Sequence, residues 1–110
     1  MVDIVQLYKL LKHIKRGKPY NPVKAIKCAD GFIISVQASM FNYCMPRDDK
    51  SPWTHVELGF PNQPIPSLFE YMDGGEDRNK MNTVWGNVPI EKVLTLLEQH
   101  GGWNETVNLD

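Results

Sequence analysis

The chain has 110 residues, of which 42% are hydrophobic and 23% charged, and its formal net charge is −1 at pH 7. This composition is typical of one folded domain, residues 1–110, and it excludes a disordered chain, while the lack of net positive charge argues against direct sequence-specific binding of nucleic acid. No apolar run approaches the ~20 residues that span a membrane, and no secretion signal opens the chain, so we expect a soluble, cytoplasmic protein without a membrane partner.

The first expected element is an amphipathic helix over residues 3–16. Asp3 can cap its first turn and Gly17 can end its last, and His13 is expected to be solvated. Apolar side chains that recur at three- and four-residue spacing form one stripe, made of Ile4, Leu7, Tyr8, Leu11 and Ile14. Two closely spaced prolines then predict a linker over residues 18–22.

A β-hairpin is expected next, because two runs of β-forming residues, 23–28 and 32–39, flank Asp30-Gly31. Asp-Gly is a strong signal for a tight turn with positive φ. In the second run the apolar face carries Phe32, Ile34, Val36 and Ala38. The opposite face, with Ser35, Gln37 and Ser39, is either solvated or a recognition surface.

A third strand is expected over residues 53–60, after a loop over residues 40–52. Strict alternation places Thr54, Val56, Leu58 and Phe60 on one face of this strand and Trp53, His55, Glu57 and Gly59 on the other. Three prolines close the strand. Residues 68–72 predict either a short strand or one helical turn, and residues 73–82 predict a polar, Gly-rich loop.

The last strand is expected over residues 83–88, with Val84 and Val88 pointing inward. Pro89 then opens a helix at its favoured first position, and Gly101-Gly102 ends it. The buried stripe of this helix is Ile90, Val93, Leu94 and Leu97. The tail, residues 103–110, has no period, so it either frays or docks through Trp103 on a neighbouring surface.

These elements predict an α+β fold of two layers. Short connections favour an antiparallel sheet of four to five strands, with an N-terminal and a C-terminal helix packed on one face. Within the single domain, residues 1–18 hold the N-terminal amphipathic helix, residues 23–102 the sheet and the C-terminal helix, and residues 103–110 the tail.

The residues that could carry catalysis or bind a metal do not form a convincing set. Cys28 and Cys44 are expected to be reduced and partly buried. Cys44, His55 and Glu57 could serve a cysteine nucleophile, but they are expected side by side rather than in a relay, and no Gly-rich elbow precedes the cysteine. Together with His100, the cysteines and His55 lack the paired spacing of zinc sites. We therefore expect no catalytic residue, metal or cofactor, and no enzyme.

Binding residues form a stronger signal. Stacking surfaces, a guanidinium fork and an amide come from five residues at loop and strand edges, Tyr43, Arg47, Trp53, Trp85 and Asn87. This set suits a nucleotide, with its base on an aromatic ring and its phosphate on arginine, and it equally suits a protein hot spot. The alternative is that the tryptophans only cover the sheet and that Arg47 pairs with Asp48 or Asp49. The predicted recognition surface consists of the two tryptophans and the loop over residues 40–52, and it fails if both rings are buried and Arg47 is held only by a neighbouring aspartate.

Several short motifs carry a resemblance to a known family. They include Cys28-Ala29-Asp30-Gly31-Phe32, Ser35-Val36-Gln37-Ala38-Ser39, Tyr43-Cys44, Pro46-Arg47, Val56-Glu57-Leu58-Gly59-Phe60-Pro61, Glu70-Tyr71, Thr83-Val84-Trp85-Gly86, Val88-Pro89 and His100-Gly101-Gly102. In this order they resemble a family of short, uncharacterised phage and prophage proteins, mostly of Firmicutes, over residues 26–102. The family has no assigned activity. The resemblance implies a context, since small phage proteins often oppose host defence by blocking an effector protein or sequestering a nucleotide signal.

The expected function is therefore inhibition of host antiviral defence by stoichiometric binding. The leading expectation is a block of an immune effector protein, as in an anti-CRISPR. The alternatives are a sponge for a cyclic or ADP-ribose-type nucleotide signal, and a cysteine-dependent enzyme that uses Cys44. The partner is accordingly a host defence protein or a signalling nucleotide, and a second copy of the chain is a further partner to consider.

Overall fold

The computed structural model describes residues 3–15, 24–39, 42–47, 52–71 and 84–108. The expected linker over residues 18–22 and the expected loop over residues 73–82 lie outside these ranges. No helix within them is long and apolar enough to cross a membrane.

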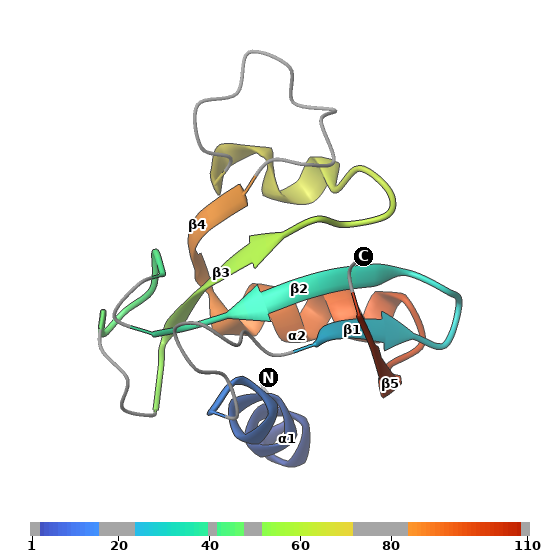
Figure 1. Ribbon diagram of the computed structural model, residues 1–110, viewed down its shortest axis with the longest axis horizontal. Helices are drawn as coiled ribbons and strands as arrows, with labels where there is room; N and C mark the ends of the chain where they lie inside the picture. Colours follow the sequence, from blue (N-terminus) through green and yellow to red (C-terminus); the bar gives the residue numbers. More distant parts are fainter. Residues whose placement is uncertain (1–2, 16–23, 40–41, 48–51, 72–83, 109–110) are drawn as a thin grey trace.

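The described residues form one antiparallel sheet and two α-helices, which confirms the α+β class (Figure 1). The strands lie in the order β4-β3-β2-β1-β5. Their bounds are β1 Ala25–Cys28, β2 Ile33–Gln37, β3 His55–Gly59, β4 Val84–Pro89 and β5 Trp103–Val107. The helices are α1 Ile4–Lys15 and α2 Ile90–Gln99, and a 3-10 helix, η1 Pro66–Tyr71, precedes β4. For residues 68–71 the helical alternative is thus the one observed, and residue 72 lies outside the described ranges.

Helix α1 is capped as expected but is rotated relative to the predicted stripe. Asp3 Oδ1 accepts hydrogen bonds from the N–H groups of Val5 and Gln6, at 3.0 and 3.3 Å. The buried arc is centred on Leu10 rather than Tyr8, so Leu11 and Ile14 are buried whereas Ile4 and Tyr8 are exposed. The predicted stripe is therefore wrong for those two residues.

His13 is buried, so the expectation of a solvated histidine is wrong. Its side chain has a partner on each side: Nε2 donates to the backbone oxygen of Lys24 at 3.0 Å, and the ring meets the Trp103 indole edge-on, with centroids 5.3 Å apart. These contacts replace water around the imidazole. They attach α1 to the residue just before β1, Lys24, and to the first residue of β5, Trp103.

The hairpin forms where the sequence predicts it. The Gly31 N–H donates to the Cys28 carbonyl at 3.0 Å, and Gly31 adopts a φ of 95°, which a residue with a Cβ rarely reaches. The four apolar side chains predicted for one face of β2 and its flanks are buried, Phe32, Ile34, Val36 and Ala38. Ser35 on the other face is buried too, and its Oγ accepts a hydrogen bond from Gln37 Nε2 at 3.1 Å.

A β-bulge in β4 changes which side chains face the core. Val56 lies opposite Val88 and Leu58 lies opposite Trp85, so two steps along β3 match three along β4. The extra residue falls at the Gly86-Asn87 step, where Asn87 has a φ of 51°. The alternation is therefore reversed across the bulge, and both Trp85 and Val88 point into the core.

Helix α2 ends as predicted. The Gly102 N–H donates to Leu97 O at 2.8 Å and the Gly101 N–H to Glu98 O at 3.0 Å, while both glycines have positive φ. This is a Schellman motif. At the other end Pro89 is the N-cap and Ile90 is the first helical residue. Pro89 was expected to be the first helical residue itself, so α2 begins one residue later than predicted. The buried side chains of α2 are Ile90, Val93, Leu96 and Leu97, with Leu94 partly buried.

The last strand is β5, which corrects the expectation that residues 103–110 are a tail without regular structure. Ala25 pairs with Val107 and Cys28 with Trp103, so β5 covers the outer edge of β1. A register shift between Lys27 and Cys28 inserts an extra residue and hides the alternation along β5. Trp103 is buried against α1, so of the two alternatives for these residues, docking through Trp103 is the one observed.

Candidate functional site

The candidate site is built on residues 42–47, which run along the start of β3. Met45 forms an antiparallel bridge with His55: the Met45 N–H donates to His55 O at 3.1 Å, and the Thr54 N–H donates to Met45 O at 2.8 Å. The short segment is thereby fixed to the sheet as an additional piece of strand, although its side chains remain largely at the surface.

Glu57 fixes the first half of the segment. Its Oε2 accepts a hydrogen bond from the Tyr43 N–H at 2.8 Å, and its Oε1 accepts one from Asn42 Nδ2 at 3.3 Å. Hydrogen bonds to a carboxylate are stronger than those between neutral groups. The carboxylate that was considered for a catalytic set, and not assigned to one, therefore holds the backbone of Tyr43.

The bulge of β4 binds the carbonyl group of Tyr43. The Asn87 N–H donates to the Tyr43 carbonyl at 2.9 Å. A Cβ on Gly86 would lie 3.1 Å from the Tyr43 Cβ, so the absence of a side chain at position 86 lets the tyrosine approach the strand. The bulge that turns Trp85 inward also brings Asn87 and Gly86 to Tyr43.

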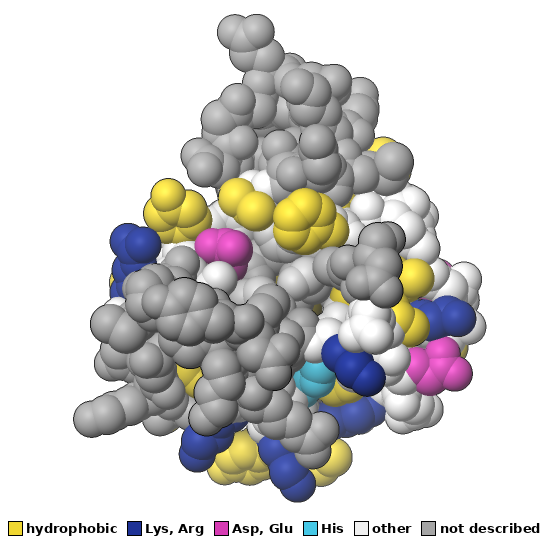
Figure 2. All heavy atoms as spheres, in the orientation of Figure 1, with side chains coloured by type: hydrophobic (Ala, Val, Ile, Leu, Met, Phe, Trp, Pro, Cys, Tyr) yellow, Lys and Arg dark blue, Asp and Glu magenta, His cyan; other side chains and the backbone are white. Residues whose placement is uncertain are grey.

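The result is an aromatic–cation pair at the surface. The Arg47 guanidinium lies over the Tyr43 ring, 5.2 Å from its centroid, and Tyr43, Met45 and Arg47 are exposed. Figure 2 shows hydrophobic side chains beside a basic and an acidic one on the left of the molecule, next to β3 and β4. We call Tyr43, Met45, Arg47 and Asn87 the Tyr43 surface.

The tryptophans do not belong to this surface, and the expectation that both are exposed is wrong. Trp53 is 3% exposed and Trp85 is 1% exposed. Trp85 is turned inward by the bulge, and Trp53 precedes the first residue of β3, where the alternation of a strand does not apply. The Trp85 indole N–H has no hydrogen-bond partner among the described residues. The predicted five-residue set is reduced to Tyr43, Arg47 and Asn87, and the proposed pairing of Arg47 with Asp48 or Asp49 lies outside those residues.

Phe60 is also placed differently from the sequence expectation. It was expected on the same strand face as Val56 and Leu58, but it follows the last residue of β3 and adopts a φ of 51°, and its side chain is half exposed whereas theirs are buried.

The cysteine set has a geometry that differs from that of a nucleophile and its base. The Cys44 thiol is buried, with Sγ 3.2 Å from Ser39 O and 3.3 Å from Pro46 O, and carbonyl oxygens favour the protonated thiol. His55 Nδ1 pairs with Thr54 Oγ1 at 2.8 Å. Both cysteines are free thiols, and the described residues contain no group of three His, Cys, Asp or Glu side chains that could hold a metal ion.

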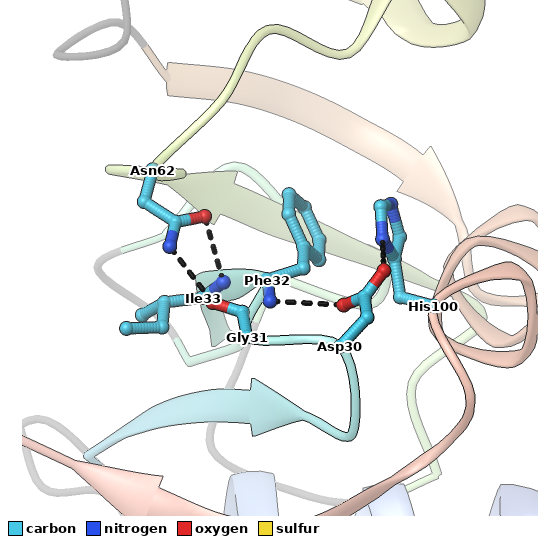
Figure 3. Close-up of polar contacts among 6 residues, drawn as sticks. All are labelled: Asp30, Gly31, Phe32, Ile33, Asn62 and His100. Atoms are coloured by element: carbon cyan, nitrogen blue, oxygen red, sulfur yellow. Dashed lines mark hydrogen bonds and ion pairs between the residues drawn. The ribbon is translucent and has the colours of Figure 1, made fainter.

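A second polar cluster lies at the β1–β2 turn (Figure 3). Asp30 Oδ1 accepts from the Phe32 N–H at 3.0 Å, and His100 Nδ1 donates to Asp30 Oδ2 at 2.6 Å. The His100 ring stacks on Phe32 with centroids 4.1 Å apart. The backbone adds a bond from the Asp30 N–H to His100 O, at 3.2 Å. The cluster thus joins the hairpin turn to the end of α2.

Asn62 closes the same region from β3's side. Its Nδ2 donates to Gly31 O and its Oδ1 accepts from the Ile33 N–H, both at 2.9 Å (Figure 3). One amide side chain thereby satisfies a donor and an acceptor of the hairpin backbone. These groups bond to the chain itself, so we assign this cluster a role in fixing the turn.

This arrangement shifts the pKa of two groups, the Asp30 carboxyl and the Cys28 thiol. The Phe32 N–H and then the His100 side chain hold the pKa of the Asp30 carboxyl below its ordinary 3.8. Burial, with the neighbouring Asp30 carboxylate as a second cause, raises the pKa of the Cys28 thiol to about 11. Cys28 is therefore an unreactive thiol at neutral pH.

Sequence reasoning missed two residues that shape the site, Glu57 and Gly86. The Gly86-Asn87 pair inside an apolar strand was a signal for a bulge. For Glu57 no local signal existed, because its partner Tyr43 is 14 positions away.

The sequence matches no protein-family model, and no solved structure matches the chain. It is 30% identical over 109 residues to NADPH-dependent diflavin oxidoreductase 1 of Candida albicans. The match covers 99% of this chain and 18% of that protein, so the chain spans less than a fifth of the length of this relative.

Proposed function

We propose that this chain is a phage-encoded accessory protein that acts in the host cytoplasm and inhibits antiviral defence by stoichiometric binding. Its first target class is an immune effector protein, which it blocks as an anti-CRISPR does. The observation that carries the proposal is the exposed Tyr43–Arg47 pair. Tyrosine and arginine are among the residues that dominate the energetics of protein interfaces.

The way in which the pair is held supports a binding role. Glu57 accepts a hydrogen bond from the backbone N–H of Tyr43 and the Asn87 N–H donates one to its carbonyl, so the backbone that carries the ring is held before any partner arrives. Preorganisation lowers the entropy cost of association. Met45 adds an exposed apolar side chain next to the pair. The resemblance of residues 26–102 to phage proteins supports the biological context.

A nucleotide sponge is the second candidate, and the same pair favours it. The planar fork of Arg47 can bind a phosphate while the Tyr43 ring stacks on a base. A cyclic or ADP-ribose-type signal has both groups. The similarity to a protein named as NADPH-dependent also supports a nucleotide ligand. With Trp53 and Trp85 buried, however, only one aromatic ring of the predicted set can stack, which favours the protein partner.

A cysteine-dependent enzyme is the class that the geometry favours least. A cysteine nucleophile acts as the thiolate, whereas the Cys44 thiol is buried against two carbonyl oxygens. An enzyme would turn over its substrate many times and would lose activity in Cys44→Ser. A binding protein would instead keep its full capacity in that variant.

Native mass spectrometry of the tagged chain, purified from phage-infected Firmicutes cells, tests the proposal. A protein blocker appears as a stoichiometric complex with a host protein, and Arg47→Ala and Tyr43→Ala both lose it. A sponge instead carries a small added mass that heat releases as intact nucleotide. Lys24→Ala is the matched control, since Lys24 is exposed and lies just before β1, which β2 separates from β3. Equal capture by Arg47→Ala and the wild type would refute the role of this surface.

A further inference from the structure

Helix α1 presents an apolar face to solvent. Ile4, Val5 and Tyr8 are 61%, 68% and 66% exposed, although the same helix buries its opposite side in the core. Lys12 and Lys15 continue this outer side one and two turns further along. Figure 2 shows hydrophobic atoms between basic side chains at the bottom of the molecule, where α1 lies. Such a face is typical of a helix that docks in a groove.

A groove of about 800 Å³ lies between α1 and α2. Its apolar lining comes from Leu94, Leu97 and Trp103, and three carboxylates, those of Asp3, Glu91 and Glu98, also border it. No ion pair among the described residues involves these carboxylates.

Lys9 is the only cation among the described lining residues of the groove. Its ammonium donates to the Trp103 carbonyl and to Asn104 Oδ1, and it lies 4.3 Å from the centre of the indole ring. The Lys9 ammonium is thus engaged by Trp103 and Asn104 of the same chain. The groove as a whole presents an excess of negative charge around an apolar floor.

We propose that this groove receives the outer face of α1 from a second copy of the chain. Ile4, Val5 and Tyr8 would cover the apolar floor, and Lys12 and Lys15 would meet the groove carboxylates, which form no ion pair among the described residues. The whole sequence has the same polarity, with nine Lys or Arg against four Asp or Glu in residues 1–50 and three against nine in residues 51–110. This inference does not depend on the proposed function.

The two surfaces lie on different sides of α1, which determines the type of assembly. The groove is bordered by Asp3, Gln6 and Lys9, whereas the docking face is formed by Ile4, Tyr8 and their neighbours on the other side of the helix. Two copies therefore cannot exchange both contacts with each other. The contact is head-to-tail, and it closes into a ring or extends into an open array.

Charge reversal tests this geometry. One variant carries Lys12→Glu and Lys15→Glu, so that its docking face and its groove are both acidic. The other carries Glu91→Lys and Glu98→Lys, so that both surfaces are basic. Each variant alone is expected to be monomeric, with the apparent dissociation constant raised about tenfold or more. An equimolar mixture is expected to assemble again, because each face then meets a groove of opposite charge.

The measurement is the mass in solution by light scattering, from low micromolar to near-millimolar concentration at low and high salt. Lys92→Glu is the matched control, because Lys92 lies on α2 outside the groove, and it should assemble like the wild type. Circular dichroism verifies that each variant folds. Val5→Ser with Tyr8→Ser, on an already exposed surface, should also be monomeric and provides a test if a reversal does not fold.

Two results would overturn the proposal. A wild-type chain that stays monomeric over the whole concentration range has no such contact. A groove variant that still assembles alone shows that α1 pairs with something other than the groove, for example with α1 of another copy.

Discussion

The His100 ring donates a hydrogen bond of 2.6 Å to the Asp30 carboxylate across 70 positions of sequence. Asp30 belongs to the hairpin turn and His100 caps the C-terminal end of α2. The pair therefore ties an early element of the chain to a late one, and protonation of the Asp30 carboxyl makes that tie depend on pH.

Replacing Asp30 with asparagine should change how the stability depends on pH. Because folding lowers the pKa of Asp30, the ionised carboxylate stabilises the fold above its ordinary pKa of 3.8. That contribution is lost as the pH falls through the lowered pKa. The free energy of unfolding, measured by urea denaturation, should thus differ between wild type and Asp30→Asn at neutral pH and converge in acid. A constant difference at every pH would contradict this account, and Glu98→Gln serves as a control for the loss of one surface charge.

The thiol of Cys28 should resist alkylation in the folded protein. Its pKa of about 11 leaves almost no thiolate at pH 8, and burial blocks the reagent. In a Cys44→Ala background, the reaction with Ellman's reagent should be slow without denaturant and fast in urea.

The same raised pKa of Cys28 has an effect on stability in base. The unfolded thiol ionises near 9.0 whereas the folded one ionises near 11. The stabilisation from this group is therefore complete below pH 9 and is lost as the pH rises through about 11. Cys28→Ser should lose less stability than wild type between these pH values, and an equal loss would contradict the prediction.

Removing the Glu57 carboxylate should loosen the segment that carries Tyr43. Glu57→Ala deletes the acceptor for the Tyr43 N–H and should cost about 1 kcal/mol of stability. Hydrogen exchange of the Tyr43 amide should become faster, while amides in the β1–β2 hairpin keep their protection. Glu57→Gln keeps an acceptor oxygen and should show an intermediate rate. Equal rates in all three proteins would argue against a positioning role.

A methyl group at position 86 should displace Tyr43. The new Cβ of Gly86→Ala would lie 3.1 Å from the Tyr43 Cβ, so Tyr43 must shift by a few tenths of an ångström, at a cost of about 1–2 kcal/mol. Gly59→Ala is the matched control on the neighbouring strand, since its new Cβ meets Val84 at an ordinary 3.6 Å. Capture of the partner should fall in the first variant and not in the second.

Local signals in the sequence were sufficient for the hairpin and for the end of α2. Asp30-Gly31 and Gly101-Gly102 supply positive φ at the points where the chain must turn, and these requirements are local. The apolar alternation in β2 also predicted its buried face, because this strand has no bulge.

The alternation of apolar and polar residues predicted the wrong buried side chains in two situations. One is a strand with a bulge, and the other is a residue that lies before the first residue of its strand. The bulge at Gly86-Asn87 turned Trp85 inward, and the irregular pairing at Cys28 hid β5. Trp53 lies two residues before the start of β3, so the alternation of that strand does not determine the direction of its side chain, which is buried. The site was found only in part for this reason: Tyr43 and Arg47 depend on the segment 42–47, whereas the tryptophans were placed by an alternation that a bulge interrupts next to Trp85 and that begins only after Trp53.

The pairing of β5 with β1 has a consequence for synthesis of the protein. During translation the edge of β1 has no neighbour until residues 103–107 have left the ribosome, because Ala25 pairs with Val107. A nascent chain halted before this point exposes that edge and leaves His13 without Trp103. Completion of the sheet is thereby delayed until nearly the whole described sequence has been made.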